Sequence, residues 1–280
     1  MNQERRLIPP RSVLGVLGVI LLLGSGAALG MVWGLAFHPP DAIGYRERDE
    51  SIDRSVTSFE SGGKPITVER YAPRSGGKHP VVVVVHGADG LQFERWTQVY
   101  QGLAQQLARR GYVALMIHYF DRTGTRFGDD ATNRANFLTW MQTLGDAVTF
   151  AGRQPDVAPD RIGLLGVSLG AYLALTNAMI DARVKAVAEY FGGLPELAAA
   201  TLRRMPPTLI LHGDADPIVP VEEAHKLRRL FDAKQIRYEL KIYPGQGHGF
   251  TRDEARDAIE RCLRFFDTHL RPDDSKSTAE

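Results

Sequence analysis

Short apolar runs and longer runs with helical spacing follow one another along most of the chain. Residues 81–85 are five consecutive valines. A run that is apolar on both faces is typical of a central strand in a parallel sheet covered by helices on both sides. After it, Trp96, Val99, Leu103 and Leu107 recur at helical spacing, which predicts an amphipathic helix. Residues 81–107 are therefore predicted to form a strand followed by a helix.

The same alternation continues to residue 270. Residues 55–60 and 66–71 flank a Gly-Gly turn, which predicts an antiparallel hairpin at one edge of the sheet. Further strands are predicted at 112–118, 161–167, 184–191, 208–212 and 238–243, and helices at 130–151, 169–180, 221–232 and 255–270. Repeated βα units predict an α/β fold with a mostly parallel, doubly wound sheet and helices on both faces.

The first part of the chain has a different pattern. Residues 13–37 contain no charged side chain and exceed the roughly 20 residues that cross a bilayer. Arg5, Arg6 and Arg11 precede this run, which favours a cytoplasmic N-terminus. We therefore expect a short cytoplasmic segment (1–12), a transmembrane helix (13–37), a linker (38–54) and an extracytoplasmic catalytic domain (55–270) with a flexible tail (271–280).

Two other interpretations of residues 13–37 remain open. The small residues Ser25, Gly26 and Ala27 are compatible with cleavage of a signal peptide, which would give a secreted protein. A buried helix of the globular domain is the third interpretation, and it would remove the membrane attachment.

Composition narrows the class of protein. Of the 280 residues, 34 are basic and 33 acidic, and this balance gives no electrostatic reason to expect a nucleic-acid partner. Cys262 is the only cysteine, which excludes an intramolecular disulfide and a cysteine-rich metal site. The chemistry described below requires no metal or other cofactor. The oligomeric state stays open.

The motif that carries the chemistry is Gly-Val-Ser-Leu-Gly at residues 166–170. It lies between a predicted strand and a predicted helix, as a nucleophile elbow requires. In such a turn Ser168 is lifted above the sheet. The motif therefore predicts a nucleophilic serine, whereas the alternative is a glycine-containing turn with an incidental serine.

A serine hydroxyl needs a neighbouring base that an acid holds in place. The loop after the strand at 208–212 contains Asp214 and Asp216, and the loop after the strand at 238–243 contains His248. We prefer Asp216 as the acid because it lies deeper in its loop. Asp214, in contrast, can cap the turn immediately after the strand. The chain order of serine, aspartate and histidine is that of α/β-hydrolases.

Two backbone amides should stabilise the oxyanion that forms during acyl transfer. They normally come from the residue after the nucleophile and from the loop after an early strand. In this chain the two positions are Leu169 and Ala88. Both are therefore predicted to form the oxyanion hole.

With these motifs the chain resembles the dienelactone hydrolase family of α/β-hydrolases over about residues 55–270. The resemblance rests on the segments 83–90, 166–170, 212–216 and 247–250. It implies the α/β-hydrolase fold and the roles already given to Ser168, Asp216 and His248. In the lactone-opening members two arginines bind the substrate carboxylate, and Arg122 and Arg252 are at similar places.

Two departures from the family pattern bear on the substrate. The lactone-opening members use a cysteine nucleophile, whereas this chain has Ser168, and Cys262 shares an apolar stripe with Ile259 and Phe266. Those members also carry a glutamate where this chain has Gly87. The resemblance therefore implies a serine hydrolase that cleaves a small-molecule carboxylic ester or lactone. An acyltransferase or exopeptidase would use the same triad, and an inactive membrane-tethered binding module is the third hypothesis.

Overall fold

The computed structural model describes residues 42–271. The segments predicted as a cytoplasmic N-terminus (1–12) and a membrane or signal helix (13–37), the first four residues of the linker (38–41) and almost all of the tail (272–280) lie outside these residues. Within residues 42–271, no helix has both the length and the apolar character needed to span a membrane. Membrane attachment therefore stays a prediction.

The strands form one eight-stranded sheet in the order β1-β2-β4-β3-β5-β6-β7-β8. The hairpin of β1 and β2 is antiparallel and forms one edge, as predicted, and β2 pairs antiparallel with β4. All pairings from β4 to β8 are parallel. The strands are β1 (Ile52–Ser61), β2 (Lys64–Pro73), β3 (His79–Val85), β4 (Val113–Ile117), β5 (Val157–Val167), β6 (Val184–Tyr190), β7 (Thr208–Gly213) and β8 (Tyr238–Tyr243).

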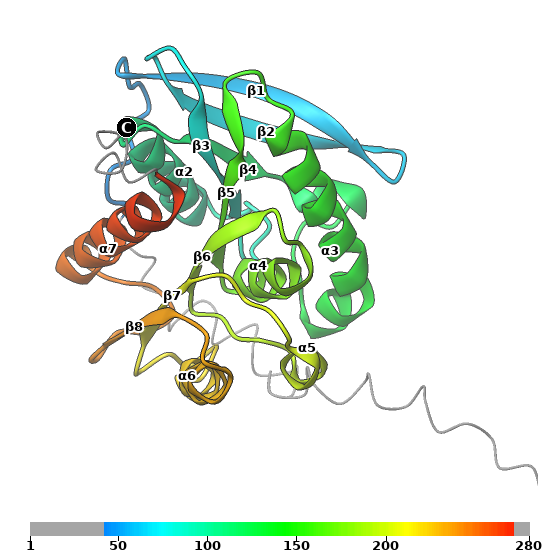
Figure 1. Ribbon diagram of the computed structural model, residues 1–280, viewed down its shortest axis with the longest axis vertical. Coiled ribbons are helices and arrows are strands. Elements are labelled where there is room, and N and C mark those ends of the chain that lie inside the picture. Colours follow the sequence, from blue (N-terminus) through cyan, green and yellow to red (C-terminus); the bar gives the residue numbers. More distant parts are fainter. Residues whose placement is uncertain (1–41, 272–280) are drawn as a thin grey trace, which may run out of the picture.

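Helices cover both faces of this sheet, as Figure 1 shows. On one face α2 and α7 pack together over the strands, and on the other face α3, α4 and α6 share a second apolar cluster. The valines predicted to form a central strand are completely buried. The helices are α2 (Glu94–Arg109), α3 (Asp130–Gly152), α4 (Leu169–Ile180), α5 (Glu196–Thr201), α6 (Glu222–Lys234) and α7 (Arg252–Leu270), with a short 3₁₀ helix, η1 (Tyr119–Arg122).

The predicted α/β architecture is confirmed over the described residues. The pattern missed α5 and η1, because one or two turns of helix contain too few residues to establish a 3.6-residue period. The loops that follow β3, β5, β7 and β8 leave from the carboxyl ends of parallel strands. They therefore meet at one edge of the sheet, where open α/β sheets bind their ligands.

Candidate active site

Ser168 lies in a tight turn between β5 and α4. Its backbone has φ 54° and ψ −121°, a left-handed region that costs a non-glycine residue about 1–3 kcal/mol. The turn is held because the Ser168 amide donates a hydrogen bond of 2.8 Å to the Tyr190 carbonyl at the end of β6. The side chain is half-buried. The sequence-predicted elbow is therefore present as a strained strand-to-helix turn.

The two glycines of the motif allow the backbone to pack closely around this turn. A Cβ on Gly166 would lie 2.3 Å from the Gly170 carbonyl oxygen, and a Cβ on Gly170 would lie 2.1 Å from the Val85 carbonyl oxygen. Neither position has room for a side chain. The second contact also brings the elbow directly against the end of β3, where the loop with Ala88 begins.

Asp216 and His248 meet at the same edge of the sheet. The Nδ1 atom of His248 lies 2.7 Å from Oδ2 of Asp216. The other carboxylate oxygen, Oδ1, accepts hydrogen bonds from the amides of Ile218 (2.8 Å) and Val219 (2.9 Å). A proton on Nδ1 that is donated to Asp216 leaves Nε2 as the basic nitrogen of the imidazole.

The environment of Asp216 favours its ionised form. Burial opposes ionisation, but the charge and hydrogen bond of His248 and the two loop amides together lower the pKa of Asp216. His212 adds a weaker contact, with its Nε2 atom 3.6 Å from Oδ2 of Asp216. An anionic Asp216 can orient His248 and stabilise a positive charge on the imidazole.

Two aromatic rings lie next to the imidazole of His248. The ring centroid of Phe191 lies 5.1 Å from that of His248, and the ring of Trp96 lies 6.4 Å away. Phe191 has a φ of 57°, and its amide donates to the Leu211 carbonyl at 2.9 Å. Because His248 is itself buried, packing as well as hydrogen bonding determines its position.

Asp214 has a different role in the structure. Its exposed carboxylate accepts a hydrogen bond of 2.6 Å from the amide of Gly245. The amide of Ala215 donates to the Gln246 carbonyl at 3.0 Å. These bonds join the aspartate loop to the histidine loop, so Asp214 holds together the two loops that bring Asp216 to His248.

The two amides predicted for the oxyanion hole lie after neighbouring strands. Leu169 is the first residue of α4, where backbone N–H groups have no acceptor within the helix. Ala88 follows β3, and its carbonyl accepts a hydrogen bond of 2.7 Å from Gly128. The elbow and the Ala88 loop therefore lie side by side, and the oxyanion role of both amides stays a prediction.

The two arginines predicted to bind substrate lie in different places. Arg122 ends η1, and its Nη1 atom donates a hydrogen bond of 2.5 Å to the carbonyl of Gly62. Gly62 is in the turn between β1 and β2, so Arg122 is directed to the hairpin rather than to His248. Arg252 is exposed at the start of α7, shortly after the histidine loop.

Asp89 is a buried carboxyl group beside the elbow that the sequence reasoning did not assign. The hydroxyl of Tyr100 donates to its Oδ1 atom at 2.6 Å and itself accepts from the Gly87 amide at 3.2 Å. Burial raises the pKa of Asp89. Its position in the same loop as Ala88 was the available signal, but the contact with Tyr100 depends on the packing of α2.

No cluster of three or more histidine, cysteine, aspartate or glutamate residues within residues 42–271 has the arrangement of a metal site. Cys262 is buried on α7, and burial raises the pKa of its thiol to about 12. A thiol with so high a pKa is a poor nucleophile at neutral pH. Packing is therefore the role that the structure gives to Cys262.

Comparison with known proteins agrees with this architecture. The model of the dienelactone hydrolase family matches residues 67–270, which is well over half of the chain. The chain belongs to the dienelactone hydrolase family. It is 24% identical to a Synechocystis protein named "Putative carboxymethylenebutenolidase", with 79% of this chain and 100% of that protein covered.

Other relatives show how varied the chemistry of similar chains is. A dipeptidyl aminopeptidase BIII from Pseudoxanthomonas mexicana is 28% identical over 67% of this chain but only 32% of its own length. A dienelactone hydrolase from Anabaena variabilis superposes with a TM-score of 0.62 at 19% identity, covering 79% of this chain and 100% of that one. The last likeness shows the α/β-hydrolase fold alone.

The departure of this dienelactone hydrolase family member at Gly87 has a physical reason in the structure. A Cβ at this position would lie 3.1 Å from both the Tyr100 hydroxyl and Oδ1 of Asp89, and 3.4 Å from Cβ of Ser168. The space that a longer side chain would need is already filled. A glutamate therefore cannot enter here unless Asp89 and Tyr100 move.

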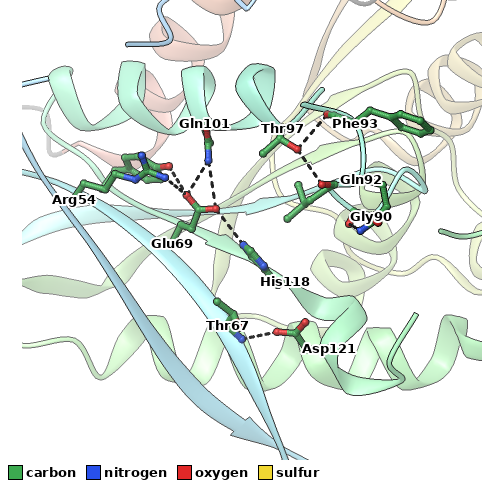
Figure 2. Close-up of polar contacts among 12 residues, drawn as sticks. Arg54, Thr67, Glu69, Gly90, Gln92, Phe93, Thr97, Gln101, His118 and Asp121 are labelled. Atoms are coloured by element: carbon green, nitrogen blue, oxygen red, sulfur yellow. Dashed lines mark hydrogen bonds and ion pairs between the residues drawn. The ribbon is translucent and has the colours of Figure 1, made fainter. Parts of the chain in front are cut away.

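A second group of polar and ionisable side chains surrounds Glu69 on β2 (Figure 2). Arg54, Gln101 and His118 approach its carboxylate at 2.8, 3.1 and 3.3 Å. The hydroxyl of Tyr71 donates to it at 2.7 Å. We call these five residues the Glu69 cluster. It contains no serine, threonine or cysteine that could act as a nucleophile.

Proposed function

We propose that this chain is a serine hydrolase that cleaves a carboxylic ester or lactone through an acyl-enzyme intermediate. The observation that carries the proposal is the 2.7 Å contact between His248 and Asp216, on the sheet edge where Ser168 occupies a strained elbow. Nucleophile, base and acid are three groups that acyl transfer requires. Membership of the dienelactone hydrolase family supports the reaction class.

The first half of the reaction forms the acyl-enzyme. Oγ of Ser168 attacks the carbonyl carbon while Nε2 of His248 takes the hydroxyl proton. The amides of Ala88 and Leu169 stabilise the oxyanion, each contributing on the order of 3 kcal/mol. His248 then gives the proton to the alkoxide as the bond to the leaving alcohol breaks.

The second half releases the acid. Water attacks the acyl carbon, His248 accepts one of its protons, and the proton passes to Oγ of Ser168 as the ester bond to the enzyme breaks. Asp216 stays ionised throughout and stabilises the imidazolium that forms in both halves. Binding of an anionic substrate by Arg252 remains a prediction.

An exopeptidase is the second candidate, because a dipeptidyl aminopeptidase matches much of the chain at 28% identity. A panel of neutral esters, lactones and dipeptide amides distinguishes the two functions. We expect turnover of esters or lactones to exceed that of peptides. Peptide turnover without ester hydrolysis would replace our first proposal with the second.

The same panel tests Ser168. The change Ser168→Ala removes the nucleophile and should lower kcat roughly a million-fold, with an unchanged melting temperature as the control for folding. If the folded variant hydrolyses the preferred substrate at the original rate, Ser168 is not the nucleophile.

A further inference from the structure

One buried hydroxyl connects the two residues on either side of Ala88. The hydroxyl of Tyr100 on α2 accepts a hydrogen bond from the Gly87 amide at 3.2 Å and donates one to Oδ1 of Asp89 at 2.6 Å. Tyr100 and Asp89 are both buried, and a hydrogen bond inside a protein is electrostatically stronger than one in water. Burial also raises the pKa of Tyr100 well above its ordinary value, so the hydroxyl keeps the proton that it donates. We call Gly87, Asp89 and Tyr100 the Tyr100 clamp.

The clamp holds a tight turn at residues 87–90. The Gly87 carbonyl accepts a hydrogen bond of 3.3 Å from the Gly90 amide, the bond that closes a β-turn with Ala88 as its first central residue. Nδ1 of His86 lies 2.8 Å from the same carbonyl. The peptide group between Gly87 and Ala88 is trans, so its N–H points opposite to its C=O. Because the Gly87 carbonyl points into the turn, the Ala88 N–H points out of it.

This turn lies against the nucleophile. A Cβ on Gly87 would lie 3.1 Å from the Tyr100 hydroxyl and 3.4 Å from Cβ of Ser168. The clamp and the elbow therefore approach the same point of the chain. On the other side of the turn, the Ala88 carbonyl accepts the hydrogen bond from Gly128 at 2.7 Å. A shift of the turn would move the Ala88 amide relative to Ser168.

The loop is also strained where the turn ends. Leu91 has a φ of 64°, a conformation that is unfavourable for a residue other than glycine. Strain of this kind persists only where the surrounding contacts impose it. Loss of the Tyr100 hydroxyl would therefore allow the loop to relax.

We propose that Tyr100 is a positioning residue for the oxyanion hole. Its hydroxyl holds the turn so that the Ala88 amide meets the oxyanion that forms when Ser168 attacks the carbonyl carbon. Tyr100 acts through the backbone on either side of Ala88 and not on the substrate. This inference rests on the proposed function and extends the site to a residue of α2.

The change Tyr100→Phe tests the clamp. It keeps the buried ring, whose centroid lies 5.9 Å from that of Trp96, and removes only the hydroxyl. An amide that meets the oxyanion stabilises the transition state rather than the bound substrate, and a misplacement of about 1 Å can cost about 100-fold in rate. We expect kcat for the preferred ester to fall about 10- to 100-fold, with KM changed by less than about twofold.

The matched control is Tyr112→Phe. Tyr112 is a buried tyrosine whose hydroxyl donates to Oδ1 of Asp267 at 2.8 Å. It directly precedes β4, at the opposite end of the parallel strands from the elbow. Both variants lose a bond between a tyrosine and an aspartate, so both should lower the melting temperature, but only Tyr100→Phe should lower kcat. Equal losses of kcat would show a general effect of destabilisation and would overturn the inference.

A pair of substrates measures the contact with the oxyanion. In the thionoester that corresponds to the preferred ester, sulfur replaces the carbonyl oxygen, and sulfur is a weak hydrogen-bond acceptor. The wild-type enzyme should therefore prefer the oxygen ester, and Tyr100→Phe should reduce this preference about tenfold or more. If kcat falls but the ratio of the two kcat/KM values stays the same, Tyr100 does not act on the oxyanion hole.

Asp89 provides an independent test of the clamp. The change Asp89→Ala removes the acceptor of the Tyr100 proton and should also lower kcat. The double variant should lose little more than the more impaired single variant, because both changes open the same clamp. Losses that multiply in the double variant would show that the two residues act separately, contrary to the proposal.

The wild-type protein separates this inference from the proposed function. If it neither hydrolyses the esters and lactones of the panel nor reacts with a fluorophosphonate, the proposed function is rejected and this inference with it. If it hydrolyses an ester and folded Tyr100→Phe keeps the full kcat, only the role of Tyr100 is rejected, and Ser168 remains the nucleophile.

Discussion

Two buried glutamates show how differently this fold treats the same side chain. Glu69 accepts hydrogen bonds from Arg54, Tyr71, Gln101 and His118. Burial raises its pKa, but His118, Tyr71 and Arg54 outweigh burial and lower the pKa to about 2. Glu189, at the end of β6, receives only the Gly192 amide at 2.7 Å, and burial raises its pKa to about 8. The number of donors, rather than burial, decides the charge.

The same difference distinguishes the Glu69 cluster from the candidate active site. The Glu69 cluster satisfies both oxygens of its carboxylate and leaves no group poised to react. Around the elbow, in contrast, Oε1 of Glu189, Oδ2 of Asp89 and Nδ1 of His212 are buried without a hydrogen-bond partner among the described residues. Buried polar atoms without a hydrogen-bond partner, together with backbone strain such as that at Ser168, are typical of functional sites. Ionisable residues alone are therefore a poor guide to a site.

The candidate active site and the Glu69 cluster should differ most in the effect that a substitution has on kcat. Asp216→Asn removes the charge that orients His248 and should lower kcat about ten-thousand-fold, as in other triads. Asp214→Asn, on the same loop, is the matched control and should change kcat far less. The rates are measured on the preferred ester, and equal losses in the two variants would contradict the choice of Asp216.

The Glu69 cluster should act on stability and leave turnover unchanged. A folded pKa below the unfolded value means that the stabilisation by Glu69 is fully present at neutral pH. It is lost as the pH falls from about 4.5 towards about 2. Glu69→Gln should lower the free energy of unfolding at neutral pH by about 3 kcal/mol, as measured by urea denaturation. A large loss of kcat in the folded variant would show that this cluster takes part in the reaction.

Glu189 should respond to pH with the opposite sign. Its raised pKa means that the folded protein keeps a proton that the unfolded chain releases. Its contribution to stability is therefore full at acidic pH and decreases as the pH rises from about 4.5 to about 8. The change Glu189→Gln should remove this dependence, up to about 1 kcal/mol per pH unit. If the free energy of unfolding of the wild-type protein and of Glu189→Gln changed in parallel across this pH range, a protonated Glu189 would be contradicted.

Much of this fold follows from local pattern. The valine strand, the edge hairpin and the alternation of strands with helices depend on which faces are buried, and burial dictates the period of the sequence. The elbow could be found because tight backbone packing at Gly166 and Gly170 requires glycine in the chain itself. Asp216 and His248 could be found because both follow parallel strands, whose ends meet at one edge.

Other features depend on contacts between distant segments, which a single sequence does not reveal. The position of Arg122 against Gly62 follows from the pairing of β2 with β4, which no local period encodes. Similarly, Tyr100 reaches Asp89 only because α2 packs over the sheet. Glu69 is ionised and Glu189 is protonated because the fold brings a different number of hydrogen-bond donors to each. The sequence shows the same residue type at both positions and does not reveal this difference.

Covalent labelling of folded wild-type protein with a fluorophosphonate, read by intact mass and peptide mapping, tests directly whether Ser168 is the nucleophile. An activated serine displaces fluoride and forms a stable phosphonate ester. We expect one adduct per chain, on Ser168, and none in Ser168→Ala. A folded protein that gains no adduct, or one labelled at another residue with Ser168 unmodified, would contradict the assignment of Ser168 as the nucleophile.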